Sequence, residues 1–447
     1  MRPELLKKYA QPVPRYTSYP TAPHFSPKVD ADTYRRWLGA IAPGTPLSLY
    51  AHVPFCKEMC WYCGCSMKVT KRHAPIERYL DALTHEIETV SGLVGTGHPV
   101  THIHWGGGSP SILEPDDILR LAGALRRGFA FADDAEFAVE IDPRGLDQAR
   151  VDAFAEAGVN RVSIGVQDFD TAVQTAINRM QSFEMTEWVV QAFRARGVQS
   201  INIDLVYGLP HQDMSTLDKT LNHVLSLRPD RIALFGYAHL PSRIVHQRLI
   251  DEAALPDMEQ RFEQANRAAN RLASAGYVGV GLDHYALPTD SLVTGNLHRN
   301  FQGYTTDTAS ALIGLGASSI GRLPQGYVQN ATPIGDYERR VANAGLATVR
   351  GHALSLDDEA RALVIERLMC DFRFPTEELR QRFGIAADPI IGEAEMLVQR
   401  DSDDLIERDG DKPGFRVTDK GRLFVRSICS AFDSYLGQSK AQHSSGI

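Results

Sequence analysis

The sequence has no long uninterrupted apolar run. No such stretch approaches the length of a membrane span, so a role within a bilayer is not expected. The N-terminal segment, MRPELLKKYAQPVPRYTSYP, has two lysines but no apolar segment behind them, and it therefore does not resemble a secretory signal. We expect a cytoplasmic protein that does not associate with membranes.

The sequence also has no excess of positive charge. Its 47 Lys and Arg residues against 55 Asp and Glu give a formal net charge of −8, which argues against a general binder of nucleic-acid phosphates. Hydrophobic content of 43% with 23% charged residues is typical of an ordinary soluble globular protein. Because single hydrophobic cores stop growing well below 447 residues, we expect two domains.

Cysteines are few, and their distribution is uneven. Four of the six lie within ten residues, at Cys56, Cys60, Cys63 and Cys65. A secreted disulfide framework would spread its cysteines over a short chain, so this crowding points to metal or redox chemistry. The distant Cys370 and Cys429 lie in apolar helical surroundings, where a free cysteine is usually a small hydrophobic residue, and we assign them no role.

Short apolar or alternating runs recur between residues 47 and 239, each followed by a helix-like stretch with apolar residues three or four apart. The six runs are Leu47–Val53, His102–Trp105, Phe137–Ile141, Arg161–Val166, Ile201–Val206 and Arg231–Tyr237. This repeated β/α order predicts parallel strands whose right-handed crossovers roll the sheet into an open or closed barrel. Functional residues are then expected at the carboxyl ends of the strands.

The cysteine cluster has the spacing CxxxCxxC on one short loop after the first predicted strand. Thiolates of Cys56, Cys60 and Cys63 could bind one 4Fe-4S cube and leave its fourth iron open to an exchangeable ligand. Structural zinc is the main alternative, although it usually combines two separated CxxC pairs, which this chain lacks. Cys65 is badly placed as a fourth ligand to the same cube, so it serves the reaction or the substrate pocket, or is simply a buried thiol.

Polar and glycine-rich motifs follow several of the other strands. The glycine run at 106 to 108 would let backbone amides approach a ligand closely, although a tight turn explains it equally well. Glu140 and Asp204 each end a buried strand, where an unpaired carboxylate would be costly. Each should therefore have a partner, either a ligand's ribose hydroxyl or ammonium group or an internal salt bridge.

Together these motifs resemble the radical S-adenosylmethionine superfamily and, within it, the oxygen-independent coproporphyrinogen III oxidases. The resemblance covers nearly the whole chain, through PRYTSYPTA, HWGGGSP, EIDPR, GVQDFD, NIDLVYGLP, YAHLP, LDHYA, HRNFQGYTT and VTDKGRL. It implies an α/β fold, a partial (β/α)6 barrel with extensions. It also implies a reaction in which a 5′-deoxyadenosyl radical starts the anaerobic decarboxylation of two propionates of coproporphyrinogen III, giving the vinyl groups of protoporphyrinogen IX in heme biosynthesis.

The resemblance also implies a 4Fe-4S cluster and two S-adenosylmethionine molecules that lie side by side. The first is expected to contact Tyr50, Gly107, Glu140 and Ile320. The second is expected to contact Tyr62, Gly108, Ser109, Gln167, Arg179, Asp204 and Ala238. His52, near the cluster, and Cys65 are the expected catalytic residues. Expected partners are the substrate and a small electron-donor protein such as a flavodoxin or ferredoxin, and the family implies a monomer.

From about Leu354 onward the pattern changes to helices and a basic segment, GFRVTDKGRLFVRS, which resembles a winged-helix cap. We therefore expect an N-terminal arm (1–45), a radical S-adenosylmethionine catalytic domain (46–350) and a smaller, mainly helical C-terminal cap (351–447). Two other functions are alternatives. A heme chaperone of the same superfamily typically lacks the fourth cysteine, and a cluster-containing DNA-binding regulator would need a strongly basic recognition helix, whereas the cap carries many acidic residues.

Overall fold

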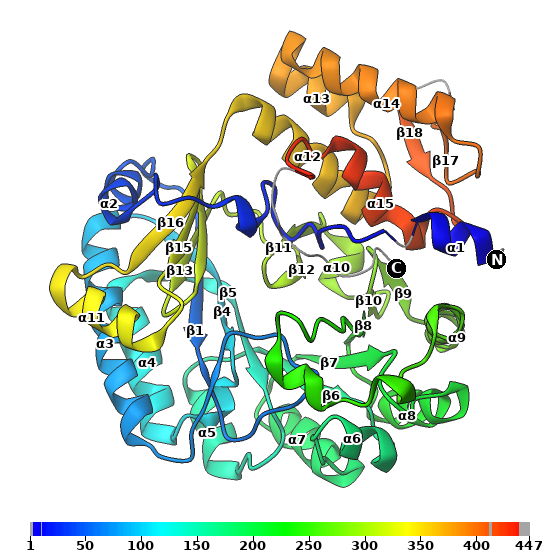
Figure 1. Cartoon of the computed structure of the whole chain (residues 1–447). Coiled ribbons are helices and arrows are strands. Elements are labelled where there is room, and N and C mark those ends of the chain that lie inside the picture. Colours follow the sequence, from blue (N-terminus) through cyan, green and yellow to red (C-terminus); the bar gives the residue numbers. More distant parts are fainter. Residues whose placement is uncertain (1–2, 10, 411–413, 438–447) are drawn as a thin grey trace.

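One twisted sheet with helices on its outer face forms the centre of the molecule (Figure 1). The computed structural model describes residues 3–9, 11–410 and 414–437, and within them twelve strands join this sheet in the order β16-β15-β14-β13-β1-β4-β5-β6-β7-β8-β10-β9. The parallel part contains β1 (Leu47–Val53), β4 (Pro99–Gly107), β5 (Ala130–Ile141), β6 (Arg161–Gln167), β7 (Ser200–Tyr207) and β8 (Arg231–Gly236). The six predicted strands are thus confirmed, in the predicted order.

Amphipathic helices connect these strands. They are α3 (Ala74–Val94), α4 (Pro115–Gly128), α5 (Gln148–Glu156), α6 (Thr171–Ala176), α7 (Phe183–Ala195) and α8 (Met214–Leu227). In α3, residues such as Tyr79, Leu83, Ile87 and Val90 recur three or four apart and are buried against the sheet. Crossovers of this length allow parallel pairing, in which Tyr50 of β1 lies opposite His104 of β4.

The sheet is extended at both ends. Next to β1 lies the parallel strand β13 (Ala311–Leu315), followed by the antiparallel strands β14 (Ile320–Leu323), β15 (Gly326–Asn330) and β16 (Thr348–Ala353). Next to β8 lie the antiparallel strands β10 (His284–Ala286) and β9 (Val278–Val280), and a separate hairpin is formed by β11 (His298–Asn300) and β12 (Gly303–Thr305). The remaining helices of this part are α2 (Ala31–Gly39), α9 (Met258–Ser274), α10 (Ser291–Thr294) and α11 (Ile334–Ala344). These additions are the extensions of the predicted partial barrel.

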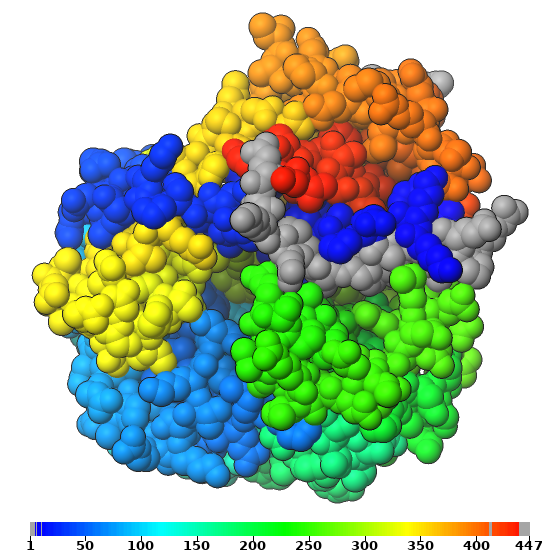
Figure 2. All heavy atoms as spheres, in the orientation of Figure 1, coloured from blue at the N-terminus to red at the C-terminus, as the bar shows by residue number. Residues whose placement is uncertain are grey.

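The C-terminal part has a hydrophobic core of its own. It contains α12 (Leu356–Asp371), α13 (Thr376–Phe383), α14 (Asp388–Arg400), α15 (Val425–Cys429) and the short antiparallel strands β17 (Ile406–Arg408) and β18 (Phe415–Val417). Leu5 of α1 (Pro3–Tyr9) and Tyr16 and Tyr19 of the following arm belong to the same core. Figure 2 shows this N-terminal segment lying against the C-terminal helices. The arm is therefore packed against the cap, which its sequence alone did not indicate.

Cys370 and Cys429 are buried free thiols, as their apolar surroundings predicted. Within the described residues, no helix combines the length and the apolar character that crossing a membrane requires. Most of the C-terminal tail, residues 438–447, lies outside the described residues.

Candidate active site

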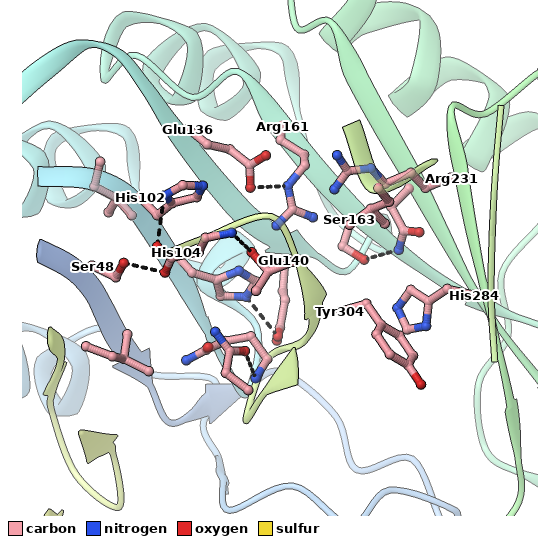
Figure 3. Close-up of a pocket in the computed structure, with 18 of the residues that line it drawn as sticks. Ser48, His102, His104, Glu136, Glu140, Arg161, Ser163, Arg231, His284 and Tyr304 are labelled. Carbon is pink, nitrogen blue, oxygen red and sulfur yellow. Dashed lines mark hydrogen bonds and ion pairs between the residues drawn. The ribbon is translucent and has the colours of Figure 1, made fainter. Parts of the chain in front are cut away.

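A polar cavity of about 900 Å³ lies inside the curved parallel sheet (Figure 3). Its lining includes His104 of β4, Glu140 of β5, Ser163 of β6 and Asp204 of β7, which come from neighbouring strands. A deeper layer, nearer the amino ends of the strands, is compensated internally. In this layer Arg161 donates to Glu136 at 2.8 Å and Asp307 accepts from Ser48. The layer nearer the carboxyl ends of the strands, which contains Glu140 and Asp204, therefore offers the polar groups that face a ligand.

The glycine run closes one wall of this site, and each glycine is required by a close neighbour. A Cβ at position 106 would lie 2.7 Å from Oε1 of Glu140, and one at position 108 would lie 2.5 Å from the Phe55 carbonyl oxygen. Gly107 has φ +115° and would place a Cβ 2.5 Å from the His52 ring. Glycine is thus needed for the approach of neighbouring strands as well as for backbone access, a reason that the sequence alone did not show.

Glu140 is held as a carboxylate by its neighbours. Burial raises its pKa, but His104 at 3.3 Å and the Gly107 amide, which donates at 3.1 Å, outweigh burial and leave the pKa below its usual value. Asp204 accepts from Ser163 at 2.8 Å and from the Asn202 amide at 2.7 Å, and burial raises its pKa. Glu140 thus has a histidine partner, whereas no salt bridge to Asp204 occurs among the described residues.

His52 connects the end of β1 to the cysteine loop. Its Nδ1 lies 2.9 Å from the Tyr50 hydroxyl, and its Nε2 lies 3.0 Å from the Ser66 carbonyl oxygen and 3.3 Å from Ser318 Oγ. Burial lowers the pKa of this histidine. The Tyr79 hydroxyl donates to the His52 carbonyl at 2.7 Å. These contacts fix the ring and hold the segment that follows the cysteines close to β1.

The four clustered cysteines share one loop, which follows the carboxyl end of β1 at the rim that the strand ends form. Cys56 ends β2 (Phe55–Cys56), which pairs with β3 (Lys68–Val69), and Cys60 is buried. The amide of Cys65 donates to Cys63 Sγ at 3.4 Å. No three His, Cys, Asp or Glu side chains of the described ranges converge as the ligands of a single metal ion. A 4Fe-4S cube takes each thiolate on a different iron, so its ligands need not converge on one point.

Two arginines surround the Cys60 thiol, and both also contact Asp142. Arg144 lies 3.3 Å and Arg179 3.4 Å from Sγ, and Arg179 lies 3.3 Å from Asp142, which Arg144 approaches to 2.7 Å. Burial lowers the pKa of Arg179, but its interactions with Tyr62, Asp142 and Cys60 outweigh burial and raise the pKa above its usual value. The guanidinium therefore stays protonated. Asp142 and Arg144 were not predicted as site residues. Their position in the EIDPR motif, on the carboxyl side of Glu140, was the available signal.

The remaining predicted residues lie around the same rim. Gln247 Nε2 donates to the carbonyl oxygens of Tyr62, at 3.0 Å, and Ala238, at 3.1 Å, so it ties the cysteine loop to the segment after β8. Ser109 Oγ accepts from the Asp142 amide at 3.2 Å. Gln167, at the end of β6, has φ 69°.

Ile320 begins β14, which lies two strands from β1 in the sheet. A Cβ at Gly314 of β13, which pairs with Tyr50, would lie 2.7 Å from the Ile320 carbonyl carbon. Residues far apart in sequence are therefore brought to one edge of the sheet, as expected for strand ends.

Family models and full-length relatives match this chain. The radical SAM superfamily model matches residues 50–224, and the model of the HemN C-terminal domain matches residues 354–424. A relative from Bradyrhizobium diazoefficiens, named oxygen-independent coproporphyrinogen III oxidase, is 47% identical over alignments spanning 100% of both chains. This chain belongs to the oxygen-independent coproporphyrinogen III oxidase family.

Other members of the oxidase family are also similar to this chain over nearly its full length. A relative of the same name from Paracoccus denitrificans is 45% identical and covers 97% of this chain and 96% of its own. A solved structure of coproporphyrinogen III oxidase (HemN) from Escherichia coli has a TM-score of 0.90 at 40% identity, covering 95% of this chain and 100% of the other. The predicted family and fold are both confirmed.

Membership of the oxidase family implies a 4Fe-4S cluster and S-adenosylmethionine. The residues present fit both groups. The cysteine loop provides thiolates, which are the usual ligands of such a cluster, next to two guanidinium groups that would balance its negative charge. Asn202 Oδ1 is buried beside Asp204 without a hydrogen-bond partner among the described residues, so a hydroxyl donor of a ligand could satisfy it.

Proposed function

We propose that this protein is a radical S-adenosylmethionine oxidoreductase that converts two propionates of coproporphyrinogen III into vinyl groups without oxygen. The observation that carries this proposal is the cysteine loop above a cavity lined by Glu140 and Asp204, in a chain similar along its full length to named oxidases. The product is protoporphyrinogen IX. Each propionate loses CO2 and a β-hydrogen, and one remaining electron passes to an acceptor.

The cluster and S-adenosylmethionine, when bound, supply the 5′-deoxyadenosyl radical that abstracts the β-hydrogen. Cys56, Cys60 and Cys63 hold the cluster in this proposal, and three ligands leave its fourth iron open. The guanidinium groups of Arg144 and Arg179 contact Cys60 and stabilise negative charge on this loop. The carbonyl contact of His52 with Ser66 positions the far end of the loop.

Two S-adenosylmethionine molecules lie along the strand ends in this proposal. The first contacts Tyr50, Gly107, Glu140 and Ile320, and the second contacts Tyr62, Gly108, Ser109, Gln167, Arg179, Asp204 and Ala238. Glu140 suits an ammonium group because its neighbours keep it ionised. Asp204 faces the cavity with hydrogen bonds from Ser163 and Asn202, and its oxygens suit ribose hydroxyls. Arg179 suits a carboxylate, which would compete with Asp142 for its guanidinium.

His52 and Cys65 are the proposed catalytic residues outside the cofactor contacts. Burial lowers the pKa of His52, so its ring is neutral at pH 7 and holds one proton that hydrogen bonds to Tyr50 and Ser66 position. Cys65 follows the cluster ligands on the same loop and is exposed. We propose that its thiol serves the substrate rather than the cluster.

A small flavodoxin or ferredoxin supplies the electrons in this account, and the protein acts in the cytoplasm as a monomer without nucleic acid or membrane. The proposal is tested by anaerobic incubation of the reconstituted, reduced protein with S-adenosylmethionine and coproporphyrinogen III. Mass spectrometry should detect loss of two CO2 units that depends on both compounds. Stable heme binding without any decarboxylation, by a protein with an intact cluster, would instead identify a heme chaperone.

A further inference from the structure

A second cavity, of about 590 Å³, lies between the N-terminal arm, the β11–β12 hairpin and α12. The arm contributes residues 16 to 19, the hairpin contributes Arg299 and the sheet contributes Arg322. The hairpin separates this cavity from the barrel cavity, because Asn300, Gln302 and Tyr304 line the barrel side. The second cavity therefore adjoins the site described above without using its residues.

Arg299 is a cation without a direct anionic partner in the described part of the chain. Its Nε and one terminal nitrogen are buried and have no hydrogen-bond partner among the described residues, and its guanidinium stacks on the Tyr304 ring at 4.4 Å. Glu366 is near, but this carboxylate accepts from the Arg299 backbone amide at 3.3 Å and from His298 at 3.1 Å. A buried cation in this state is costly unless an anion binds it.

Arg322 is the second uncompensated cation of this cavity. It lies 6.0 Å from the centre of the Tyr327 ring and makes no ion pair within the part of the chain that the structure describes. It is exposed, and Glu359 and Glu366 act on it only through longer-range attraction. Its guanidinium is thus available to an anion that enters the cavity.

The arm brings a further arginine, Arg15, within electrostatic reach of Arg299. Arg426 donates to the carbonyl oxygens of Val13, at 2.5 Å, and Pro14, at 3.0 Å, and so fixes the arm immediately before Arg15. Burial lowers the pKa of Arg15; the charge of Asp283 raises it in part, and the charge of Arg299 lowers it again. Asp283 offsets part of the repulsion between Arg15 and Arg299, and a bound anion would relieve the rest.

We infer that this cavity is a carboxylate-binding subsite, in which Arg299 and Arg322 bind a propionate that the reaction leaves intact. The inference rests on the proposed function, since the substrate carries four propionates and only two react. Both cavities contain acidic and basic side chains, but the arginines of the barrel cavity, Arg161 and Arg231, are paired with Glu136 and Asp290. The second cavity is lined by Glu359 and Glu366 as well, yet Arg299 and Arg322 make no ion pair among the described residues. Guanidinium groups bind carboxylates through two parallel hydrogen bonds, which also orient the macrocycle.

The test compares Arg322→Gln, Arg299→Gln and Arg299→Lys with the wild-type holoenzyme. Arg340→Gln is the matched control, because Arg340 is half-exposed on α11 and pairs with Asp336 at 3.1 Å. The ligands are coproporphyrinogen III and an analogue whose two unreactive propionates are replaced by ethyl groups. KM is measured for both, and dissociation constants are measured by fluorescence for their oxidised porphyrin forms.

Arg322→Gln and Arg299→Gln should raise KM for coproporphyrinogen III by about 10- to 100-fold, while Arg299→Lys should recover part of the loss. The wild type should bind the analogue about 10- to 100-fold more weakly than the natural ligand, and Arg322→Gln should no longer discriminate between them. Iron content and S-adenosylmethionine affinity should match Arg340→Gln. Arg322 is exposed, so its variant tests the subsite even if Arg299→Gln fails to fold.

The inference would be overturned if Arg322→Gln still discriminated between coproporphyrinogen III and the ethyl analogue as strongly as the wild type does. A change in kcat without a change in KM would also overturn it. Failure of the proposed function is distinguishable, because the wild type would then release no CO2. The porphyrin dissociation constants would still decide whether these arginines form a carboxylate subsite.

Discussion

Replacing Gly107 by alanine tests whether the close approach of β4 to His52 organises the site. Gly107 has φ +115°, a backbone conformation that costs an alanine about 1–3 kcal/mol. The new Cβ would lie 2.5 Å from the His52 ring, which hydrogen bonds to Tyr50 and Ser66 hold in place. Moving the ring away would break these two hydrogen bonds, at about 1 kcal/mol each.

The two effects together predict a decrease of about 3–5 kcal/mol in the free energy of unfolding, a large part of the stability of a typical domain. Urea unfolding followed by circular dichroism measures this decrease. Gly92→Ala is the control, because Gly92 lies in α3 with no atom near its missing Cβ, and helix propensity predicts a gain of up to about 1 kcal/mol.

A double-mutant cycle separates the two causes. In a His52→Ala background the overlapping ring is gone, so Gly107→Ala should cost only the strain of its backbone, about 1–3 kcal/mol. If Gly107→Ala is as stable as Gly92→Ala, or costs as much without the His52 ring as with it, then contact between these residues does not constrain the site.

Four further variants test other parts of the site and the cap. Cys63→Ser should lower the iron content of the reconstituted protein, whereas Cys65→Ser should keep the iron and lose decarboxylation; equal iron loss in both would contradict a three-cysteine site. Arg179→Gln should decrease the free energy of unfolding by about 1.5–3 kcal/mol, because it removes the hydrogen bond to the Gly165 carbonyl and one of the two cations that contact the half-buried Asp142; an unchanged free energy of unfolding would contradict this. Burial raises the pKa of Asp358, but His352, Ser355 and Tyr435 lower it to about 2, so its ionised form stabilises the folded protein above pH 4 and this contribution is lost as the pH falls toward 2. Asp358→Asn should therefore cost about 2 kcal/mol in urea unfolding at pH 7 and progressively less below pH 4, and a cost that does not change with pH would contradict the assignment.

The parallel strands and the cysteine loop could be predicted from sequence because their signals are local. Alternating apolar runs such as Arg161–Val166 and amphipathic helices such as α3 follow from neighbouring residues. The cluster spacing is likewise contained within ten residues. The family resemblance added the contacts expected of distant residues such as Ile320.

Other features depend on tertiary packing and had no such signal. Packing of Tyr16 and Tyr19 into the core of the cap joins segments about 350 residues or more apart, which no periodicity predicts. Arg144 acquires its place beside Cys60 only when the end of β5 meets the cysteine loop. The lack of a direct anionic partner for Arg299 is likewise a property of the fold, because sequence shows a charge but not its neighbours.

Transfer of a labelled hydrogen tests the central claim most directly. Coproporphyrinogen III deuterated at the β-carbons of its propionates is incubated anaerobically with the reconstituted, reduced protein and S-adenosylmethionine. The account predicts that 5′-deoxyadenosine gains deuterium as the two CO2 molecules are released. Release of CO2 with unlabelled 5′-deoxyadenosine, or labelled substrate that remains intact beside a fully assembled cluster, would contradict it.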